Sequence, residues 1–353
     1  MKLYFSKNAG KLYDLFASIY VACNLDYYYE EVEKMDISID QEFKELMNDI
    51  ISLLGDDIHK YKAYFTISNI AYSLIDIEKI WELENLDKYL KYIESKDNYD
   101  IQKSLLSFVD SYGESWIPTM DDEKFKGIIN DNNLLFKFLN DKPIPSEEKW
   151  TIITIINDVN EFKRTFISLI EEYEKKYSSF IKNYESDINK YTNLLEEEIN
   201  NKGINMSIPI FQLVSSKEVD TLYIMTSYFQ AYTISQTVKR AEHASYMFIG
   251  KYVDKVFQSK NRDNSVDKYV SIFKNLSDLN RYKFIKLLSQ GEKYGQEIAD
   301  ELNITSATVS YHANNLLITN LLKMERYENK TYYSLNKDTL REMINFIKKD
   351  LEL

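Results

Sequence analysis

The sequence predicts a mainly α-helical protein with a small β-sheet component, divided into two domains. Its 353 residues include only 8 Gly and 4 Pro, too few turn-forming residues for a many-stranded β fold. Apolar residues recur at spacings of three and four through much of the chain, which is the period of an amphipathic helix. We therefore predict a helical N-terminal domain over 1–260, with a small antiparallel sheet near 204–250, and a second domain over 265–353.

The acidic charge of the chain belongs to the predicted N-terminal domain. The formal net charge is −12, which by itself argues against a nucleic-acid-binding protein, because such proteins usually carry a basic surface. Residues 271–353 nevertheless carry 12 Lys and Arg against 11 Asp and Glu, whereas the rest of the chain carries 32 against 45. A nearly neutral C-terminal domain is compatible with DNA binding if its basic groups share one face.

Cysteine content and hydropathy favour a cytoplasmic protein without a membrane span. Cys23 is the only cysteine, so no internal disulfide forms, as expected in a reducing compartment. No apolar run approaches the roughly 18 residues that a transmembrane helix needs. The apolar run 15–22 loosely resembles a lipoprotein signal, but Asp14 directly precedes it. We interpret 10–24 as an amphipathic first helix instead.

The N-terminal domain is predicted to be built mainly from helices. Several helices are expected over 1–115, and proline-containing breaks at 116–118 and 142–145 bound another over 123–140. An apolar stripe with steps of three and four then runs through Phe162, Phe166, Leu169, Tyr173, Tyr177, Phe180, Tyr184, Ile188, Tyr191, Leu195 and Ile199. This repeat predicts one long helix over 160–202, on the order of 60 Å at 1.5 Å per residue. Its aromatic stripe favours packing against other helices, and self-pairing into a dimer is the alternative.

The stretch after this helix changes character. Four segments rich in β-branched and aromatic residues are predicted strands, namely 206–214, 221–225, 233–238 and 245–249. They make up the predicted antiparallel sheet, and helices are expected to cover it. The polar stretch 261–265 is the expected hinge to the last domain.

The last domain has an ordered series of short elements. They are helices over 276–288, 296–302 and 306–317, a β-hairpin of strands over 321–327 and 330–335, and a final helix over 338–351. Asn303 and Ile304 form a tight turn between the second and third helices, and Thr305 is a suitable N-cap for the third. Two helices joined by a tight turn and followed by a hairpin predict a winged helix-turn-helix.

The third helix of this domain carries the candidate surface for double-stranded DNA. Val309, Ala313 and Leu316 share its inner face, so the opposite side is exposed. Small and hydrogen-bonding residues there permit close approach to a major groove and contacts with base edges or phosphates. The candidate residues are Thr305, Ser306, Ala307, Thr308, Ser310, Tyr311 and Asn314. The candidate phosphate contacts on or near the hairpin are Lys323, Arg326 and Lys330.

These segments resemble the winged helix of the ArsR family of transcription regulators. The resemblance is carried by 276–281, 296–302, 305–312 and 330–335, and it covers under a quarter of the chain. It implies a sequence-specific repressor or activator that binds a palindromic operator as a homodimer, with the helix from Ser306 in the major groove. The long N-terminal region also resembles a helical extension found in a group of bacterial regulators, which implies dimerisation or the sensing of a small-molecule effector.

The sequence departs from the metal-sensing members of that family. The resemblance places their Cys-x-Cys pair near Tyr294 and Gln296, where no thiol occurs, and no His follows His312. We therefore expect no metal site and no cofactor. Ala313 and Asn320 stand where the family usually has Leu and Gly, which predicts different local packing. We interpret His312 as a partly buried, hydrogen-bonded residue.

Two other classes of function stay open. The overall acidity also suits an interaction protein whose winged helix binds protein instead of DNA. An enzyme in the N-terminal domain is the second alternative, but the sequence has no phosphate-binding Gly-rich loop, no Gly-x-Ser-x-Gly elbow and no His-Glu-x-x-His motif. With one Cys and three His in the chain, we expect a regulator and not an enzyme.

Overall fold

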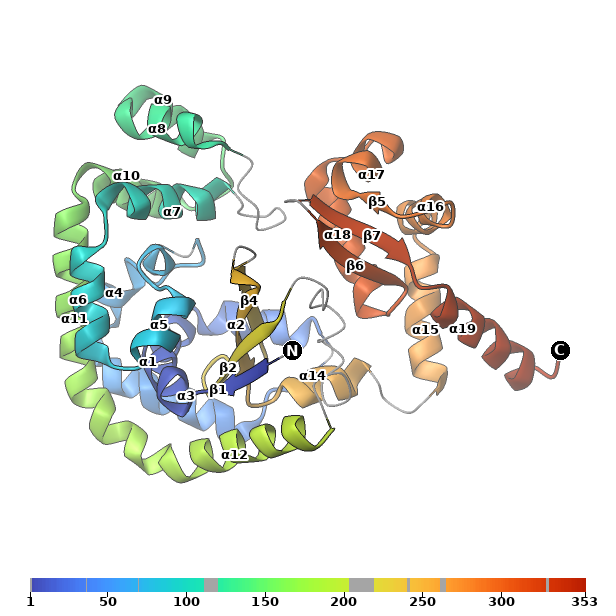
Figure 1. Cartoon of the computed structure of the whole chain (residues 1–353), viewed down its shortest axis with the longest axis horizontal. Helices are drawn as coiled ribbons and strands as arrows, with labels where there is room; N and C mark the ends of the chain where they lie inside the picture. Colours follow the sequence, from blue (N-terminus) through green and yellow to red (C-terminus); the bar gives the residue numbers. More distant parts are fainter. Residues whose placement is uncertain are drawn as a thin grey trace. The chain divides into compact units, whose positions relative to one another are not determined.

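The structure, a computed structural model, describes residues 2–35, 37–68, 70–110, 120–202, 219–239, 242–260, 265–327 and 330–353. These residues fall into two compact units (Figure 1): an N-terminal unit up to Lys255 and a C-terminal unit from Val256 onward. Helices predominate in both, and each unit contains one small sheet, so the predicted mainly α class is confirmed. The predicted break at 116–118, the predicted strand at 206–214 and hinge residues 261–264 lie outside the described residues.

The N-terminal unit contains most of the helices of the chain. They are α1 (Lys7–Cys23), α2 (Leu25–Glu33), α3 (Gln41–Leu54), α4 (Ile58–Lys62), α5 (Ile77–Leu83), α6 (Leu86–Ser95), α7 (Asn98–Asp110), α8 (Asp122–Asn130), α9 (Asn132–Asn140), α10 (Ser146–Asn157), α11 (Val159–Phe180) and α12 (Glu185–Lys202). Short 3-10 turns form η1 (Gly55–Asp57), η2 (Ala71–Ser73) and η3 (Ile181–Tyr184). Helix α14 (Val253–Lys260) spans the point at which one unit gives way to the other.

The sheet of the N-terminal unit is mixed, which corrects the predicted antiparallel sheet. Its strands are β1 (Lys2–Phe5), β2 (Thr221–Ser227), β3 (Ile234–Lys239) and β4 (Ala244–Gly250), in the order β1-β2-β4-β3. Strand β2 runs parallel to both β1 and β4, and only the β3–β4 pair is antiparallel. Parallel neighbours require a long crossover connection, and here more than 200 residues separate β1 from β2. Local sequence patterns therefore do not reveal the pairing of β1.

Helix α1 packs closely against the sheet and is buried along most of its length. Ser6 caps it, with its hydroxyl oxygen accepting a hydrogen bond from the backbone N–H of Ala9 at 3.0 Å. The predicted start at residue 10 was therefore three residues late. A Cβ at Gly10 would lie 2.7 Å from the backbone oxygen of Thr226 in β2, so only glycine permits this approach.

The predicted single helix over 160–202 is interrupted. Helix α11 is followed by the 3-10 turn η3 and then by α12, and Figure 1 shows the two α-helices running in different directions around the unit. Most side chains of the predicted stripe are buried within the unit. The ring of Phe166, for example, stacks on those of Phe16 and Phe65. The stripe therefore packs against neighbouring helices, as predicted, but along a bent path.

The predicted helix over 123–140 is also two helices, α8 and α9. Asp131 separates them, and its carboxylate accepts hydrogen bonds from the backbone N–H groups of Asn133 and Leu134 at 2.8 and 3.4 Å. An Asp at this position caps a new helix more readily than it continues the old one.

In the part of the chain that is described, no helix is both long and apolar enough to cross a bilayer.

The C-terminal unit has the predicted helices and hairpin in the predicted order, and it adds two elements that were not predicted, helix α15 and strand β5. They are α15 (Ser265–Leu276), α16 (Leu279–Leu288), β5 (Lys293–Tyr294), α17 (Gly295–Leu302), α18 (Ser306–Ile318), β6 (Leu322–Tyr327), β7 (Lys330–Leu335) and α19 (Lys337–Asp350). The three strands form an antiparallel sheet in the order β5-β7-β6. Phe284, Ile298, Val309, Leu316 and Tyr333 are buried in the core that joins these elements.

Candidate nucleic-acid interface

A tight turn joins helices α17 and α18 and sets their relative direction. Asn303 adopts the left-handed conformation (φ 53°), which Asn tolerates better than most residues. The backbone N–H of Ile304 then donates to the carbonyl oxygen of Ala299 at 3.0 Å. Thr305 begins the next helix, because its hydroxyl oxygen accepts a hydrogen bond from the backbone N–H of Thr308 at 3.1 Å. The predicted N-cap role of Thr305 is confirmed.

Helix α18 is buried on one side and exposed on the other. Val309, Ala313 and Leu316 are at most 1% exposed, as the sequence predicted for the inner face. The side chain of Tyr311 is 64% exposed, Asn314 is also exposed, and Thr308 and Ser310 are half-buried. The backbone of Ser306 and Ala307 forms the first turn of α18, and their side chains lie outside the described residues. Among the candidates on α18 whose side chains are described, Ser310, Tyr311 and Asn314 are therefore accessible to a molecule that approaches from solvent.

The N-terminal end of α18 is electrostatically suited to a phosphate. The first turn of the helix contains no acidic residue that would neutralise the positive end of its dipole. The whole helix, from Ser306 to Ile318, contains no Asp, Glu, Lys or Arg, and its one titratable base is the buried His312. Attraction to a nucleic acid must therefore come from backbone N–H groups at this end and from cations on other elements.

Strands β6 and β7 form the hairpin that the sequence predicted as a wing. Lys323 is exposed on β6 and pairs in register with Ser334. Arg326 pairs with Thr331, and Lys330 pairs with Tyr327 next to the tip of the hairpin. The structure thus places the backbones of all three predicted phosphate contacts on one hairpin. The side chains of Arg326 and Lys330, and residues 328–329 at the tip, lie outside the described residues.

His312 lies beneath the exposed face of α18. It is 6% exposed, and its ring meets that of Tyr311 edge-on, with 5.5 Å between centroids. The Nδ1 atom has no hydrogen-bond partner among the described residues, so the predicted hydrogen bond is not made at this ring nitrogen. Burial lowers the pKa of His312 below its ordinary value, the carboxylate of Asp278 opposes this shift, and the guanidinium of Arg281 adds to it.

The lowered pKa of His312 predicts a loss of stability in acid. In the unfolded chain, the His312 side chain has an ordinary pKa of about 6.5. Because its pKa in the folded unit is lower, the unfolded chain binds more protons as the pH falls. The folded unit is therefore fully stabilised above about pH 6.5 and loses stability below it. We expect α18 to lose protection from hydrogen–deuterium exchange as the pH falls below about 6.5, relative to a His312→Gln variant compared at each pH. An equal response of the two proteins would contradict this prediction.

The positions that depart from the usual family residues lie in the C-terminal unit. Asn320, which follows α18, has a left-handed conformation (φ 56°), so Asn fills a position that favours glycine. Ala313 is fully buried in the core of the unit. Over the ranges that the structure describes, no group of three or more His, Cys, Asp or Glu side chains is arranged to hold a metal ion.

Comparison with known proteins bears on this unit. The family model described as "Bacterial regulatory protein, arsR family" matches residues 278–323, from the N-cap of α16 to the second residue of β6. The transcriptional repressor SdpR of Bacillus subtilis (strain 168) is 35% identical over 83 residues, which are 22% of this chain and 92% of SdpR. The chain belongs to the arsR family of bacterial regulatory proteins.

Two solved structures are also similar to part of this arsR-family chain. HlyU from Vibrio cholerae N16961 is 19% identical, with a TM-score of 0.22, over 24% of this chain and 94% of HlyU. NolR from Sinorhizobium fredii is 16% identical, with a TM-score of 0.22, over 25% of this chain and 89% of NolR. The family match and the SdpR match identify the chain as a DNA-binding regulator.

Proposed function

We propose that this protein is a sequence-specific, non-metal-sensing transcription regulator that binds a palindromic operator in the cytoplasm as a homodimer. In this proposal α18 lies in the major groove and the β6–β7 hairpin contacts phosphates beside it. A small-molecule effector bound elsewhere shifts operator affinity by binding one state of the dimer better than another. The N-terminal unit has a regulatory and not an enzymatic role.

One observation carries the DNA-binding part of this proposal. Helix α18 is held by three buried apolar side chains and leaves Ser310, Tyr311 and Asn314 facing outward from the same short helix. Hydroxyl and amide groups of this kind hydrogen-bond base edges and phosphates. The absence of acidic side chains along the helix supports the approach of a polyanion.

The surface of the C-terminal unit supports the proposed homodimer. Helices α15 and α19 are neighbours, since the rings of Tyr269 and Phe346 stack at a centroid distance of 4.3 Å. These two helices also carry large apolar side chains that are 41–48% exposed, namely Val270, Phe273 and Ile344. Exposed apolar side chains gathered on neighbouring helices are typical of a surface that a second subunit covers.

The acidity of the N-terminal residues supports an orientation for the complex. Before residue 271 the chain carries 32 Lys and Arg against 45 Asp and Glu, while residues 271–353 are nearly neutral. Like charge repels the acidic unit from the phosphate backbone, so DNA approaches the C-terminal unit first.

The proposal is tested by binding purified full-length protein to fluorescent duplexes. Genomic fragments enriched by the protein supply the specific duplex, and a shuffled sequence supplies the non-specific one. We expect affinity for the specific duplex to fall steeply with salt, because each phosphate contact releases counterions. Sedimentation should show the mass of two chains on one duplex. Failure to bind any duplex at low salt would overturn the proposal and favour a winged helix that binds protein.

A further inference from the structure

Arg281, in the first turn of α16, is a mostly buried cation without a hydrogen-bond acceptor. Its side chain is 18% exposed, and its Nε atom is buried without a partner among the described residues. The terminal nitrogens Nη1 and Nη2 are not buried, and they too donate to no described residue. A guanidinium can only donate, so leaving it unpaired costs free energy. An acceptor supplied from outside the unit would remove that cost.

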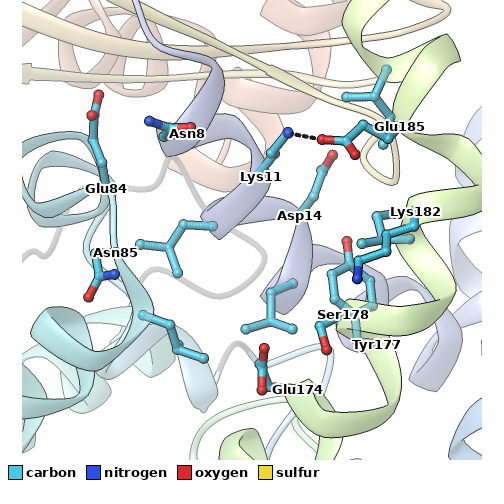
Figure 2. A pocket seen from close by; sticks show the side chains of 15 residues that line it. Asn8, Lys11, Asp14, Glu84, Asn85, Glu174, Tyr177, Ser178, Lys182 and Glu185 are labelled. Atoms are coloured by element: carbon cyan, nitrogen blue, oxygen red, sulfur yellow. Dashed lines mark hydrogen bonds and ion pairs between the residues drawn. The ribbon is translucent and has the colours of Figure 1, made fainter.

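Cations of comparable burial elsewhere in the described chain have a carboxylate at hydrogen-bonding distance. Lys142, Lys251 and Lys293 have side chains that are 15–24% exposed, and the ammonium of each lies 2.7–3.0 Å from a carboxylate oxygen. Figure 2 shows the same pairing in the N-terminal unit for the more exposed Lys11, whose ammonium lies 2.5 Å from a glutamate. Arg281 differs from these cations in having no such partner.

The carboxylate nearest to the Arg281 guanidinium is engaged in another contact. Oδ1 of Asp278 lies 3.9 Å from Nε of Arg281, which is too far for a hydrogen bond. The same oxygen accepts a hydrogen bond from the backbone N–H of Arg281 at 2.9 Å, because Asp278 is the N-cap of α16. Asp278 therefore fixes the start of the helix and leaves the guanidinium available.

The guanidinium of Arg281 lies beside the exposed face of α18. Burial lowers the pKa of His312, the Asp278 carboxylate opposes this shift and the Arg281 guanidinium adds to it, so the three groups are neighbours. The ring of His312 in turn meets that of Tyr311, which is 64% exposed on the outward side of α18. Arg281 thus reaches the surface at the edge of the face that we assign to DNA.

A cation at this edge is well placed for the sugar-phosphate backbone. The major groove is about 12 Å wide, and a helix with its side chains is about 10–12 Å across, so phosphates line both flanks of a helix that lies in the groove. Helix α18 has no Lys or Arg of its own to contact them. A neighbouring element must therefore supply the positive charge on each flank.

We propose that Arg281 binds a phosphate of the DNA backbone beside α18, with its terminal N–H groups donating to the phosphate oxygens. The planar fork of a guanidinium matches two oxygens of one phosphate, and the buried Nε holds that fork in place. This contact comes from α16, in addition to those proposed for α18 and the hairpin. It rests on the proposed placement of α18 in the major groove.

Arg281→Gln in the full chain tests the contact. Anisotropy titrations over a salt series at pH 7.5 should show that the specific and the shuffled duplex are weakened alike, by roughly tenfold for each bound chain. The slope of log affinity against log salt should fall by about 0.9 for each bound chain. The Tm of the free protein should stay unchanged or rise, because the guanidinium makes no hydrogen bond there.

Two lysine variants provide the controls. Lys283→Gln makes the same change of charge on the same helix, at an exposed position roughly 200° around its axis, so it should weaken the duplexes by no more than about twofold. Arg281→Lys keeps the charge and loses the fork, so it should restore the salt slope and most of the affinity. A purely structural guanidinium would instead lower the Tm in both Arg281 variants.

Asp278→Asn provides an independent test of where the phosphate lies. Asn keeps the N-cap of α16 and removes a negative charge that lies close to the guanidinium. Both duplexes should therefore bind severalfold more tightly, while the Tm changes little. An ion pair that served only the fold predicts a lower Tm and no gain in affinity.

The outcomes separate this contact from the proposed function. Unchanged affinity and salt slope in Arg281→Gln would overturn the contact, and so would a change in the ratio of specific to shuffled affinity, which indicates a base contact. A lower Tm without rescue by Arg281→Lys would assign Arg281 to the fold. In all three cases, loss of specificity on replacing Ser310 and Tyr311 would still support α18 in the groove. Failure of the native chain to bind any duplex would overturn both proposals.

Discussion

Replacing Ser310 and Tyr311 together by Ala is expected to remove most of the difference in affinity between the specific duplex and a shuffled one. Both side chains lie on the outward side of α18, and neither is needed to hold the helix against the core. Side chains that read base edges contribute on the order of 1–3 kcal/mol each to discrimination, which is about tenfold or more in the affinity ratio. Anisotropy titrations with both duplexes measure that ratio directly.

The hairpin provides the matched comparison for this prediction. Arg326→Ala with Lys330→Ala should weaken both duplexes alike, because phosphate contacts carry no sequence information. Removing two such contacts should also flatten the plot of log affinity against log salt by roughly 1.8. If the hairpin pair altered the affinity ratio, or if the α18 pair altered only the salt slope, the assignment of α18 to the groove and the hairpin to the backbone would be wrong.

The C-terminal unit could be predicted closely because its signals are local. Thr305 caps α18 through a hydrogen bond to Thr308, three residues away, and the inner face of that helix follows from helical spacing alone. The hairpin is equally local, since Tyr327 and Lys330 pair across its tip. His312 shows the limit of such reasoning. Its burial followed from its place on the helix, but whether its ring nitrogens find partners depends on α16, which supplies Asp278 and Arg281.

The N-terminal unit was harder to predict because its decisive contacts are distant in sequence. Strand β1 pairs with β2 across most of the chain, and a four-residue segment gives little local sign of being a strand. The apolar stripe with steps of three and four predicted one straight helix over 160–202, but η3 bends the path between α11 and α12.

Truncating Phe284 to Ala is expected to abolish duplex binding although this residue is far from any predicted DNA contact in sequence. Phe284 is fully buried in the core of the C-terminal unit, and its ring meets Tyr333 of β7 at a centroid distance of 6.0 Å. Removing a buried Phe side chain costs about 3–5 kcal/mol, comparable to the whole stability of many small domains. The unit should therefore populate unfolded states, and apparent affinity falls in proportion to the competent fraction.

Two comparisons separate this mechanism from a loss of DNA contacts. Tyr282→Ala changes an aromatic residue of the same helix that is 53% exposed, so it should shift stability by no more than about 0.5 kcal/mol and leave duplex affinity intact.

The second comparison follows unfolding of the N-terminal unit. Trp81 and Trp150 both lie in that unit, so the urea midpoint reported by their emission should be the same for Phe284→Ala and the native chain. If that midpoint fell together with duplex binding, the two units would unfold as one, which would contradict the prediction. If it held while exchange of α17 and α18 amides accelerated, DNA binding would depend on a C-terminal unit that folds separately from the N-terminal unit.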